Sequence, residues 1–591
     1  MTETEVKADV LVIGGGGAGF RAAIGARGKG VETLLLSKGP LARCGATPMA
    51  GADFTLDGKS LSRLGFPGEP NDTREKFLND MLTQGFFLNN QKLCEHYIEA
   101  APLRLKELMD WGWQIIGSEQ RAVMGSGIGI MDALLGRARK LGVSLMEDIM
   151  VIDLTTCENR VTGALGLDVK TGEFIRFSAK AVVMATGGWH KAFWPNTGMR
   201  DLSGEGIAMA HRAGADIGNM EFITFCPNVA YEPPNCRGSI FPYGVHYFCG
   251  GSLANNTGET FLEKYDPLVV EKGTTTEWNK CFISFATCRE VRAGRGGKEG
   301  GIFYGPGDVP FSVFEERLKP VFPNWKYKAL DLSEFARRFK AGESLEVGPA
   351  VEYFDGGIVV NERYETKLGG LFAAGECTLG PFGANRVFAA ITEMLVHGAD
   401  AGENAAAYAQ KESVPAPDPA ALTAIKDETR KILERTDGLN PAQVRRRIQN
   451  RAHRDLAPIR TKRELTNFVE FIETLKKEQM PNLCSFSKTR VYNKGWIDII
   501  ELRNMVHLLE AAARSALART ESRGVHFRED YPNTDNDNWF HESVVKLDNE
   551  SMLIEHRPVT ATTMAPSAGV VPYEKMLKKM MATHSNIGGG H

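Results

Sequence analysis

The sequence lacks three features that would point to common classes of protein. Its 10 cysteines are scattered, without a C-x-x-C pair, so the clustered thiolates that zinc and iron–sulfur sites need are missing and we expect no metal site. It has no run of ~18 apolar residues, which predicts no membrane-spanning helix. A formal net charge of −3 gives no electrostatic basis for binding nucleic acid.

The beginning of the chain also lacks a recognisable targeting segment. Residues 1–9, MTETEVKAD, are polar and acidic, without the basic and apolar regions of a secretory signal. Together with the low cysteine density, this predicts a cytoplasmic protein. At 591 residues the chain is long enough for more than one domain.

The most informative stretch is 8–38, ADVLVIGGGGAGFRAAIGARGKGVETLLLSK. An apolar strand, Ala8–Ile13, runs into a glycine-rich turn and a helix, and a second strand follows at Val31–Leu36. Such a turn between strand and helix places backbone N–H groups and the positive end of the helix dipole against a pyrophosphate. The turn contains Gly14, Gly16, Gly17, Ala18 and Gly19. It therefore predicts a dinucleotide site, although the second strand ends in Ser37-Lys38 instead of the acid typical of NAD binding.

Two later segments strengthen this interpretation. Residues 181–188 read AVVMATGG, and residues 370–376 read GLFAAGE, followed by GANR at 383–386. In this order, with Ser37-Lys38 at the end of the second strand, the segments resemble the flavoprotein subunit of the fumarate reductase and succinate dehydrogenase family. The resemblance extends to 256–265 and to ESRGVHFREDYP at 521–532.

The resemblance implies FAD as the cofactor. The residues that it would place around FAD are Gly14, Gly16, Gly17, Ala18, Gly19, Ser37, Lys38, Cys44, Gly45, Ala46, Ala185, Thr186, Gly187, Gly188, Glu376 and Arg386. Cys44 falls where covalently flavinylated relatives carry the flavin-linked histidine. It could be bonded to the flavin or be a small residue beside it, and the second alternative is the one we expect.

The predicted fold is α/β, with a Rossmann-like FAD-binding domain, an inserted α+β capping domain and a C-terminal helical domain. We expect the FAD-binding domain at 1–225 and 351–413 and the capping domain at 226–350, where proline, glycine, aromatic and charged residues are mixed without a dominant period. Helical periodicity with charged faces predicts the helical domain at 418–532. Residues 533–591 are expected to form an extended arm with a short helix near 573–582.

The resemblance also suggests how an anionic substrate would be held. Arg386 in the GANR segment and Arg289 from the capping domain match the two family arginines that bind substrate, and a guanidinium pairs well with carboxylate oxygens. Arg292 and Arg295 lie close to Arg289 in the sequence, so the choice among the three stays open. We expect Arg289 and Arg386 to approach one face of the flavin from opposite domains.

The rest of the family's substrate site is altered. Cys226 and Glu352 stand where the family has two substrate-binding histidines, and Thr260 stands where it has a proton-relay arginine. Glu352 could repel a dicarboxylate, or it could pair with a nearby arginine and shape the pocket. We therefore name Arg289, Arg386, Glu352 and Cys226 as candidate catalytic residues and expect weak or absent activity on fumarate and succinate.

Three functions remain open from the sequence. The first is an FAD-dependent oxidoreductase that exchanges two electrons with a small anionic substrate. The second is an enzyme similar to adenylylsulfate reductase, because CREVRAGRGGKEGGIFY at 288–304 loosely resembles that branch. The third is a flavin relay without its own substrate. In each case the resemblance implies an iron–sulfur, ferredoxin-like partner subunit, contact with a membrane only through a partner, and a place in electron transport.

Overall fold

The computed structural model describes most of the chain. The described residues are 4–51, 53–119, 121–241, 249–265, 280–318, 333–414, 418–548 and 551–583. Within these ranges, none of the helices combines the length and apolarity that crossing a bilayer requires. The predicted capping-domain stretch 226–350 therefore includes three segments that lie outside the described residues.

A 7-stranded sheet forms the centre of the FAD-binding region. Its strands run in the order β6, β2, β1, β9, β8, β7, and β16 also pairs with β9. Pairing is parallel for β1 with β2 and β9, for β2 with β6 and for β16 with β9, while β7–β8–β9 is an antiparallel meander. The bounds are β1 Thr4–Ile13, β2 Thr33–Leu36, β6 Ser144–Met146, β7 Ile149–Cys157, β8 Arg160–Asp168, β9 Phe174–Met184 and β16 Leu371–Ala373.

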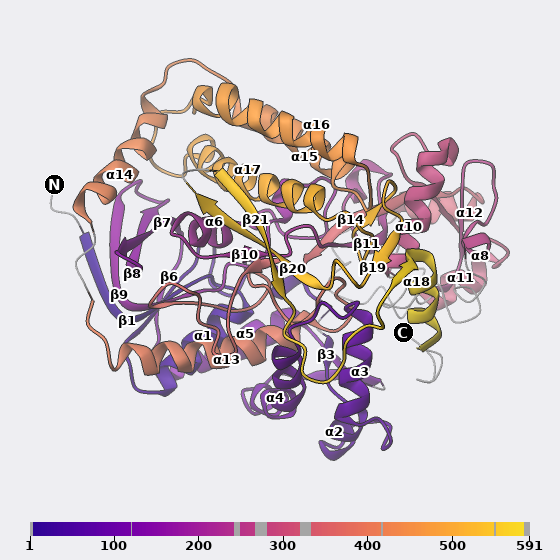
Figure 1. Cartoon of the computed structure of the whole chain (residues 1–591), viewed down its shortest axis with the longest axis horizontal. Helices are drawn as coiled ribbons and strands as arrows, with labels where there is room; N and C mark the ends of the chain where they lie inside the picture. The colour runs from indigo at the N-terminus through magenta and orange to yellow at the C-terminus, as the bar shows by residue number, and fades with distance from the viewer. Residues whose placement is uncertain are drawn as a thin grey trace.

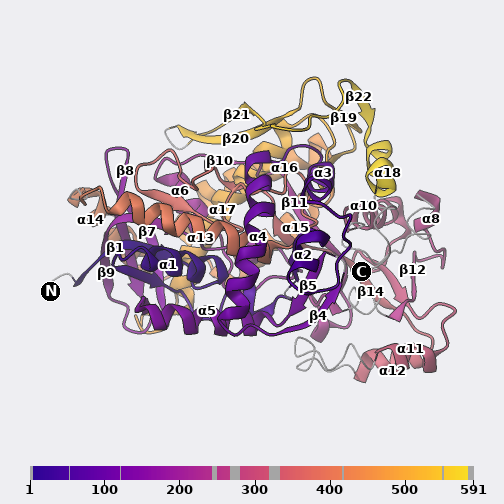
Figure 2. The ribbon, with the colours of Figure 1, turned by 90° about the horizontal axis from the view of Figure 1, so that it is seen from below.

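The strands of this sheet are buried because helices pack against it. The last four residues of β1 and all of β2 are buried, and α1 packs against α13, as the view in Figure 2 shows. A 3-stranded sheet, β3-β5-β4, lies in the same half. The bounds are α1 Gly17–Gly28, α2 Gly58–Arg63, α3 Arg74–Gln84, α4 Gln91–Asp110, α5 Gly127–Leu141, α6 Glu205–Arg212, α13 Ala390–Ala409, β3 Asp53–Thr55, β4 Ile115–Glu119 and β5 Ala122–Gly125.

A second, antiparallel sheet and several short helices form the other end of the molecule, on the right of Figure 1. The sheet has the order β11-β14-β13-β12. Its strand β14 leads directly back into the FAD-binding region. The bounds are β11 Ile223–Ala230, β12 Ser252–Ala254, β13 Ile302–Gly305, β14 Leu345–Phe354, α8 Leu262–Tyr265, α10 Lys280–Glu290, α11 Phe311–Leu318 and α12 Ser333–Lys340.

Three long helices lie along the top of Figure 1, and a fourth, α14, lies at its left side. They are α14 Pro419–Glu434, α15 Pro441–Asp455, α16 Lys462–Thr474 and α17 Lys494–Ala518. Each begins at a capping residue whose side chain accepts a backbone N–H bond: Asp418, Asn440, Thr461 and Asn493. Proline at the first position of α14 and α15 suits the same helix start. The α/β fold with a helical region toward the C-terminus is thereby confirmed.

The stretch from residue 533 onward is more structured than an extended arm. β20 His541–Asp548 and β21 Ser551–Pro558 form an antiparallel hairpin, which extends the short strands β10 Ile217–Gly218 and β15 Gly357–Ile358 into a 4-stranded sheet. β19 Asn533–Asp535 pairs with β22 Val570–Pro572. The expected short helix is present as α18 Tyr573–Thr583 and lies beside α10 (Figures 1 and 2).

Candidate functional site

The glycine turn between β1 and α1 brings two backbone segments into direct contact. A Cβ at Gly19 would lie 1.8 Å from the Gly14 carbonyl oxygen, and a Cβ at Gly14, where φ is +129°, would lie 2.1 Å from the Ala185 carbonyl oxygen. α1 starts after Gly16 without a side-chain cap at that residue. Gly17 N donates to Thr47 Oγ1, so the N–H groups that follow Gly17 are the ones that could bind an anion. This cradle fits the pyrophosphate of a dinucleotide.

The predicted loop 44–46 lies against the start of α1. Gly17 N donates to Thr47 Oγ1 at 3.2 Å, just after Ala46, and Gly45 N donates to Asp201 Oδ2 at 2.8 Å. The Cys44 Sγ is 3.2 Å from Ser37 Oγ. Burial raises the pKa of the Cys44 thiol, which disfavours the reactive thiolate. The environment of Cys44 therefore favours a small residue beside the cofactor over a covalent bond.

The Lys38 side chain takes part in a charged network. Its Nζ donates to Glu501 Oε1 at 3.0 Å and to Ser203 Oγ at 3.0 Å, and it also pairs with Glu205. Lys38 therefore joins β2 to the helical region.

The segments 185–188 and 376 meet at the carboxyl end of β9 and β16. Gly188 N donates to Glu376 Oε2 at 3.2 Å, and burial raises the pKa of Glu376. Among the described residues, the buried Thr186 Oγ1 lacks a hydrogen-bond partner within the protein. A polar cofactor would supply that partner, so this edge of the sheet fits FAD as the glycine turn does.

A cluster of three charged side chains joins the capping region to the FAD-binding region. Glu352, on β14, accepts from Lys280 Nζ at 2.9 and 2.7 Å and lies 3.2 Å from Arg386 Nη2. Lys280 is the first residue of α10, and its side chain is buried. Of the two alternatives for Glu352, pairing with a nearby arginine agrees with this geometry. The cluster brings two cations to one carboxylate.

Two carboxyl groups that can be protonated, Asp355 and Glu393, lie near Arg386. The Arg386 guanidinium stacks over the Tyr353 ring at 5.0 Å, and Tyr353 OH donates to Glu393 Oε2 at 2.5 Å. Asp355 accepts from Thr224 Oγ1 at 2.7 Å. Burial raises the pKa of both Asp355 and Glu393 to about 8. Both carboxyls can therefore hold a proton near neutral pH.

The three arginines considered for the capping domain have other partners. Arg289 lies 3.1 Å from Glu574 and over the Phe285 ring at 5.0 Å. Arg292 pairs with two glutamates of the helical region, and Arg295 pairs with Glu290. The contacts of the described residues thus place Lys280, not Arg289, beside Arg386. The expected meeting of Arg289 and Arg386 is not found there.

Cys226 lies on β11 next to β14, opposite Ala350. Its side chain is buried in a small apolar cluster with Val229 and Ala350. Sequence reasoning named Cys226 and missed Lys280. The signal that could have found Lys280 is a single cation at the start of an apolar helix, KCFISFA, where burial would require an acidic partner.

Comparison with known proteins agrees with this geometry. A model described as "FAD binding domain" matches residues 9–124 and 113–390, and one described as "Fumarate reductase flavoprotein C-term" matches 445–574. One subunit of a fumarate reductase (CoM/CoB) from Methanothermobacter marburgensis is 29% identical, over 89% of this chain and 95% of the relative. An uncharacterized FAD-dependent oxidoreductase from Methanocaldococcus jannaschii is 30% identical, over 92% and 96%.

Comparison with solved structures also finds flavoproteins of similar fold. Mycobacterium smegmatis Sdh1 in complex with UQ1 is 28% identical, with a TM-score of 0.82 over 95% of this chain and 96% of that chain. An adenosine-5-phosphosulfate reductase is 20% identical with a TM-score of 0.76, over 95% and 98%, which shows a shared fold only. FAD is therefore the cofactor, and the protein is an FAD-dependent oxidoreductase. The chain belongs to the flavoprotein-subunit family of fumarate reductases and succinate dehydrogenases.

Proposed function

We propose that this flavoprotein subunit exchanges two electrons between FAD and a small substrate that carries a single carboxylate. The observation that supports the proposal is the pairing of Lys280 and Arg386 with one glutamate, Glu352. The two cations approach Glu352 from different parts of the chain, α10 and the loop before α13. A substrate carboxylate placed between them would accept from both.

A second substrate carboxylate would lie close to the Glu352 carboxylate, and two like charges in one partly buried site repel each other. Burying an excess charge is costly. Burial raises the pKa of Asp355 and Glu393 to about 8, so near neutral pH both groups can hold a proton instead of adding negative charge beside Arg386. The site therefore favours a monocarboxylate over fumarate or succinate.

Each side chain has a defined part in this proposal. FAD, when bound, supplies the two-electron hydride exchange. The Arg386 fork orients the substrate carboxylate, Lys280 supplies the second cation, and Glu352 holds both cations in place before substrate binds. Protonated Glu393 holds a proton at a carboxyl oxygen, with Tyr353 between it and Arg386. Cys226 is proposed to shape the substrate cavity. Gly45 and the other residues predicted to bind the cofactor are proposed to shape the FAD cavity.

We also propose that the partner is an iron–sulfur electron-transfer subunit. The matched relatives are named as subunits, among them a succinate dehydrogenase flavoprotein subunit of Rickettsia bellii, 26% identical over 96% of this chain and 98% of the relative. Among the described residues, no group of three or more His, Cys, Asp or Glu could hold a metal ion. The chain purified alone should show negligible turnover with NADH, and fast NADH-driven turnover without a partner would contradict this proposal.

Titration of the oxidised, FAD-loaded protein tests the substrate class. We expect crotonate, a monocarboxylate, to perturb the flavin absorbance and fumarate to bind at least ~10-fold more weakly, a difference of ~1.4 kcal/mol. Tighter binding of fumarate would contradict the proposal. A response only to adenylylsulfate would favour a sulfur-nucleotide enzyme, and no response to any anion with fast reduction by a partner would favour a flavin relay.

A further inference from the structure

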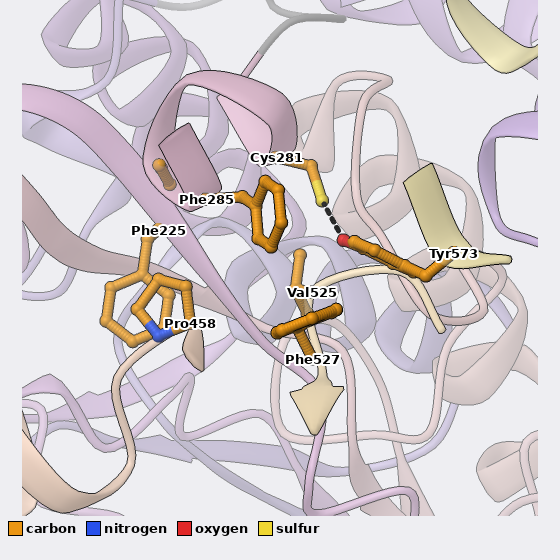
Figure 3. A pocket seen from close by; sticks show the side chains of 8 residues that line it. Phe225, Cys281, Phe285, Pro458, Val525, Phe527 and Tyr573 are labelled. Atoms are coloured by element: carbon orange, nitrogen blue, oxygen red, sulfur yellow. Dashed lines mark hydrogen bonds between the residues drawn. The ribbon is translucent and has the colours of Figure 1, made fainter. Parts of the chain in front are cut away.

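The last described helix, α18, contacts the first turn of α10 through one buried tyrosine. Tyr573 is 1% exposed, and its OH donates to the Gly524 carbonyl oxygen at 2.5 Å. Cys281 Sγ lies 3.4 Å from the same OH and donates to the same carbonyl at 3.2 Å. Figure 3 shows Cys281 and Tyr573 pointing toward one another. Residues 281, 524 and 573 therefore form one hydrogen-bonded junction.

Aromatic packing closes this junction. The Tyr573 ring lies 5.1 Å from Phe527 and 5.6 Å from Phe285, centre to centre. The space enclosed among these side chains, with Phe225 and Ser284 on its wall (Figure 3), is no larger than a water molecule. A cavity of that size binds no substrate. The junction is therefore a packing contact between α18, α10 and the segment at 524–527.

The junction is directly connected to Lys280 and Arg386. These are the two cations of the proposed anion site, which consists of Lys280, Glu352 and Arg386. Cys281 follows Lys280 in the chain, so fixing Cys281 fixes the backbone from which the Lys280 side chain extends. On the other side, Val525 N donates to the Ala384 carbonyl oxygen at 3.0 Å, two residues before Arg386. A Cβ at Gly524 would lie only 2.0 Å from the same oxygen. The backbone at 524–525 thus lies against the loop that carries Arg386.

We propose that Tyr573 is a positioning residue, which holds the start of α10 so that Lys280 meets Glu352 and the substrate carboxylate. The inference rests on the proposed function of Lys280. The first turn of a helix lacks intrahelical partners for its N–H groups and frays readily. A lysine side chain is flexible, so its charge is well placed only if its backbone is held. Tyr573 supplies that restraint from a segment far away in the sequence.

A double-mutant cycle on the FAD-loaded full chain tests this inference, with crotonate as the probe. We expect Lys280→Gln to raise the Kd for crotonate at least ~10-fold. Tyr573→Ala removes both the buried hydrogen bond and the ring contacts with Phe285 and Phe527, and we expect it to raise the Kd ~3- to 10-fold. Because Tyr573 acts through Lys280, adding Tyr573→Ala to Lys280→Gln should change the Kd less than ~2-fold further. Flavin content and Tm report folding for every variant.

Two further variants keep the test sharp. Tyr573→Phe retains the ring and loses only the hydroxyl, so it replaces alanine if the alanine variant loses flavin, and we expect a rise in Kd of about 3-fold. Glu574→Gln, at an exposed neighbour on α18 (52% exposed side chain), is the matched control and should leave the Kd unchanged.

The possible failures are distinguishable. An unchanged Kd in the Tyr573 variants, or an equal loss in the native and Lys280→Gln backgrounds, overturns the positioning role and leaves the proposed function standing. Native crotonate affinity in Lys280→Gln overturns the proposed function, and the positioning role with it.

Discussion

The nucleotide cradle and the cluster of Lys280, Glu352 and Arg386 are built in different ways. In the cradle, backbone lies against backbone, as where a Cβ at Gly19 would lie 1.8 Å from the Gly14 carbonyl oxygen. In the anion site, three long side chains from α10, β14 and the loop before α13 meet at Glu352. A backbone site accepts few substitutions, whereas a side-chain site can change its ligand by exchanging charges.

The largest expected effect is on the cradle. Gly19→Ala would drive a methyl group into the Gly14 carbonyl, so the turn must shift, and we expect near-complete loss of bound FAD on purification. Flavin absorbance per protein measures this. Gly28→Ala, at the far end of α1 where a Cβ meets nothing within 4 Å, is the matched control and should retain FAD. Full FAD content in Gly19→Ala would show that the cradle is not rigid.

The next largest effect is expected for Arg386→Lys, which should weaken anion binding and leave FAD binding unchanged. Arg386→Lys keeps the charge but removes the planar fork that contacts Glu352 and the Phe388 carbonyl oxygen. Because truncating a buried charge pair costs ~2 kcal/mol or more, crotonate should bind at least ~30-fold more weakly while FAD stays bound. Titration and flavin content are measured on the same sample. Loss of FAD instead would assign Arg386 to the structure of the FAD-binding region.

A smaller effect concerns pH. Burial raises the pKa of Glu393 to about 8, above its value in an unfolded chain, so the folded protein binds the extra proton. Its contribution to stability is full below about pH 4 and is lost as the pH rises toward 8. The Tm should therefore fall between pH 5 and 8, and Glu393→Gln, which can still accept from Tyr353, should fall less steeply. Equal slopes for both proteins in differential scanning fluorimetry would contradict this assignment.

The smallest effect is expected for Arg289→Gln. Its guanidinium pairs with an exposed glutamate, Glu574, and exposed pairs contribute ~1 kcal/mol or less. We expect FAD content to be unchanged and crotonate affinity to change less than ~2-fold. A large loss of affinity would return Arg289 to the substrate site and would remove the contrast with Lys280.

The sequence predicted the cradle because its signal is local. Strand, glycine turn and helix follow one another within 8–38, and short-range rules apply to them. The anion site was predicted only in part, because Lys280 and Glu352 are 72 residues apart and three nearby arginines offered the same charge. Which cation reaches the site depends on the direction of α10, which no local pattern encodes.

The same limit applies near the C-terminus. The helix at 573–583 has its own periodicity and was predicted. The hairpin of β20 and β21 was expected to be an extended arm, because its pairing with β10 depends on residues far away in the chain.

That pairing has a consequence for how the protein is made. Ser543 N donates to Asn219 Oδ1 across 324 residues of chain, so β10 gains β20 as its second neighbour, beside β15, only after those intervening residues have been synthesised. Contacts of such long range form slowly and leave a strand edge exposed in the meantime. A nascent chain of this protein would therefore rely on chaperones late in synthesis, and a bulky tag fused near α18 would disturb assembly more than one placed before β1.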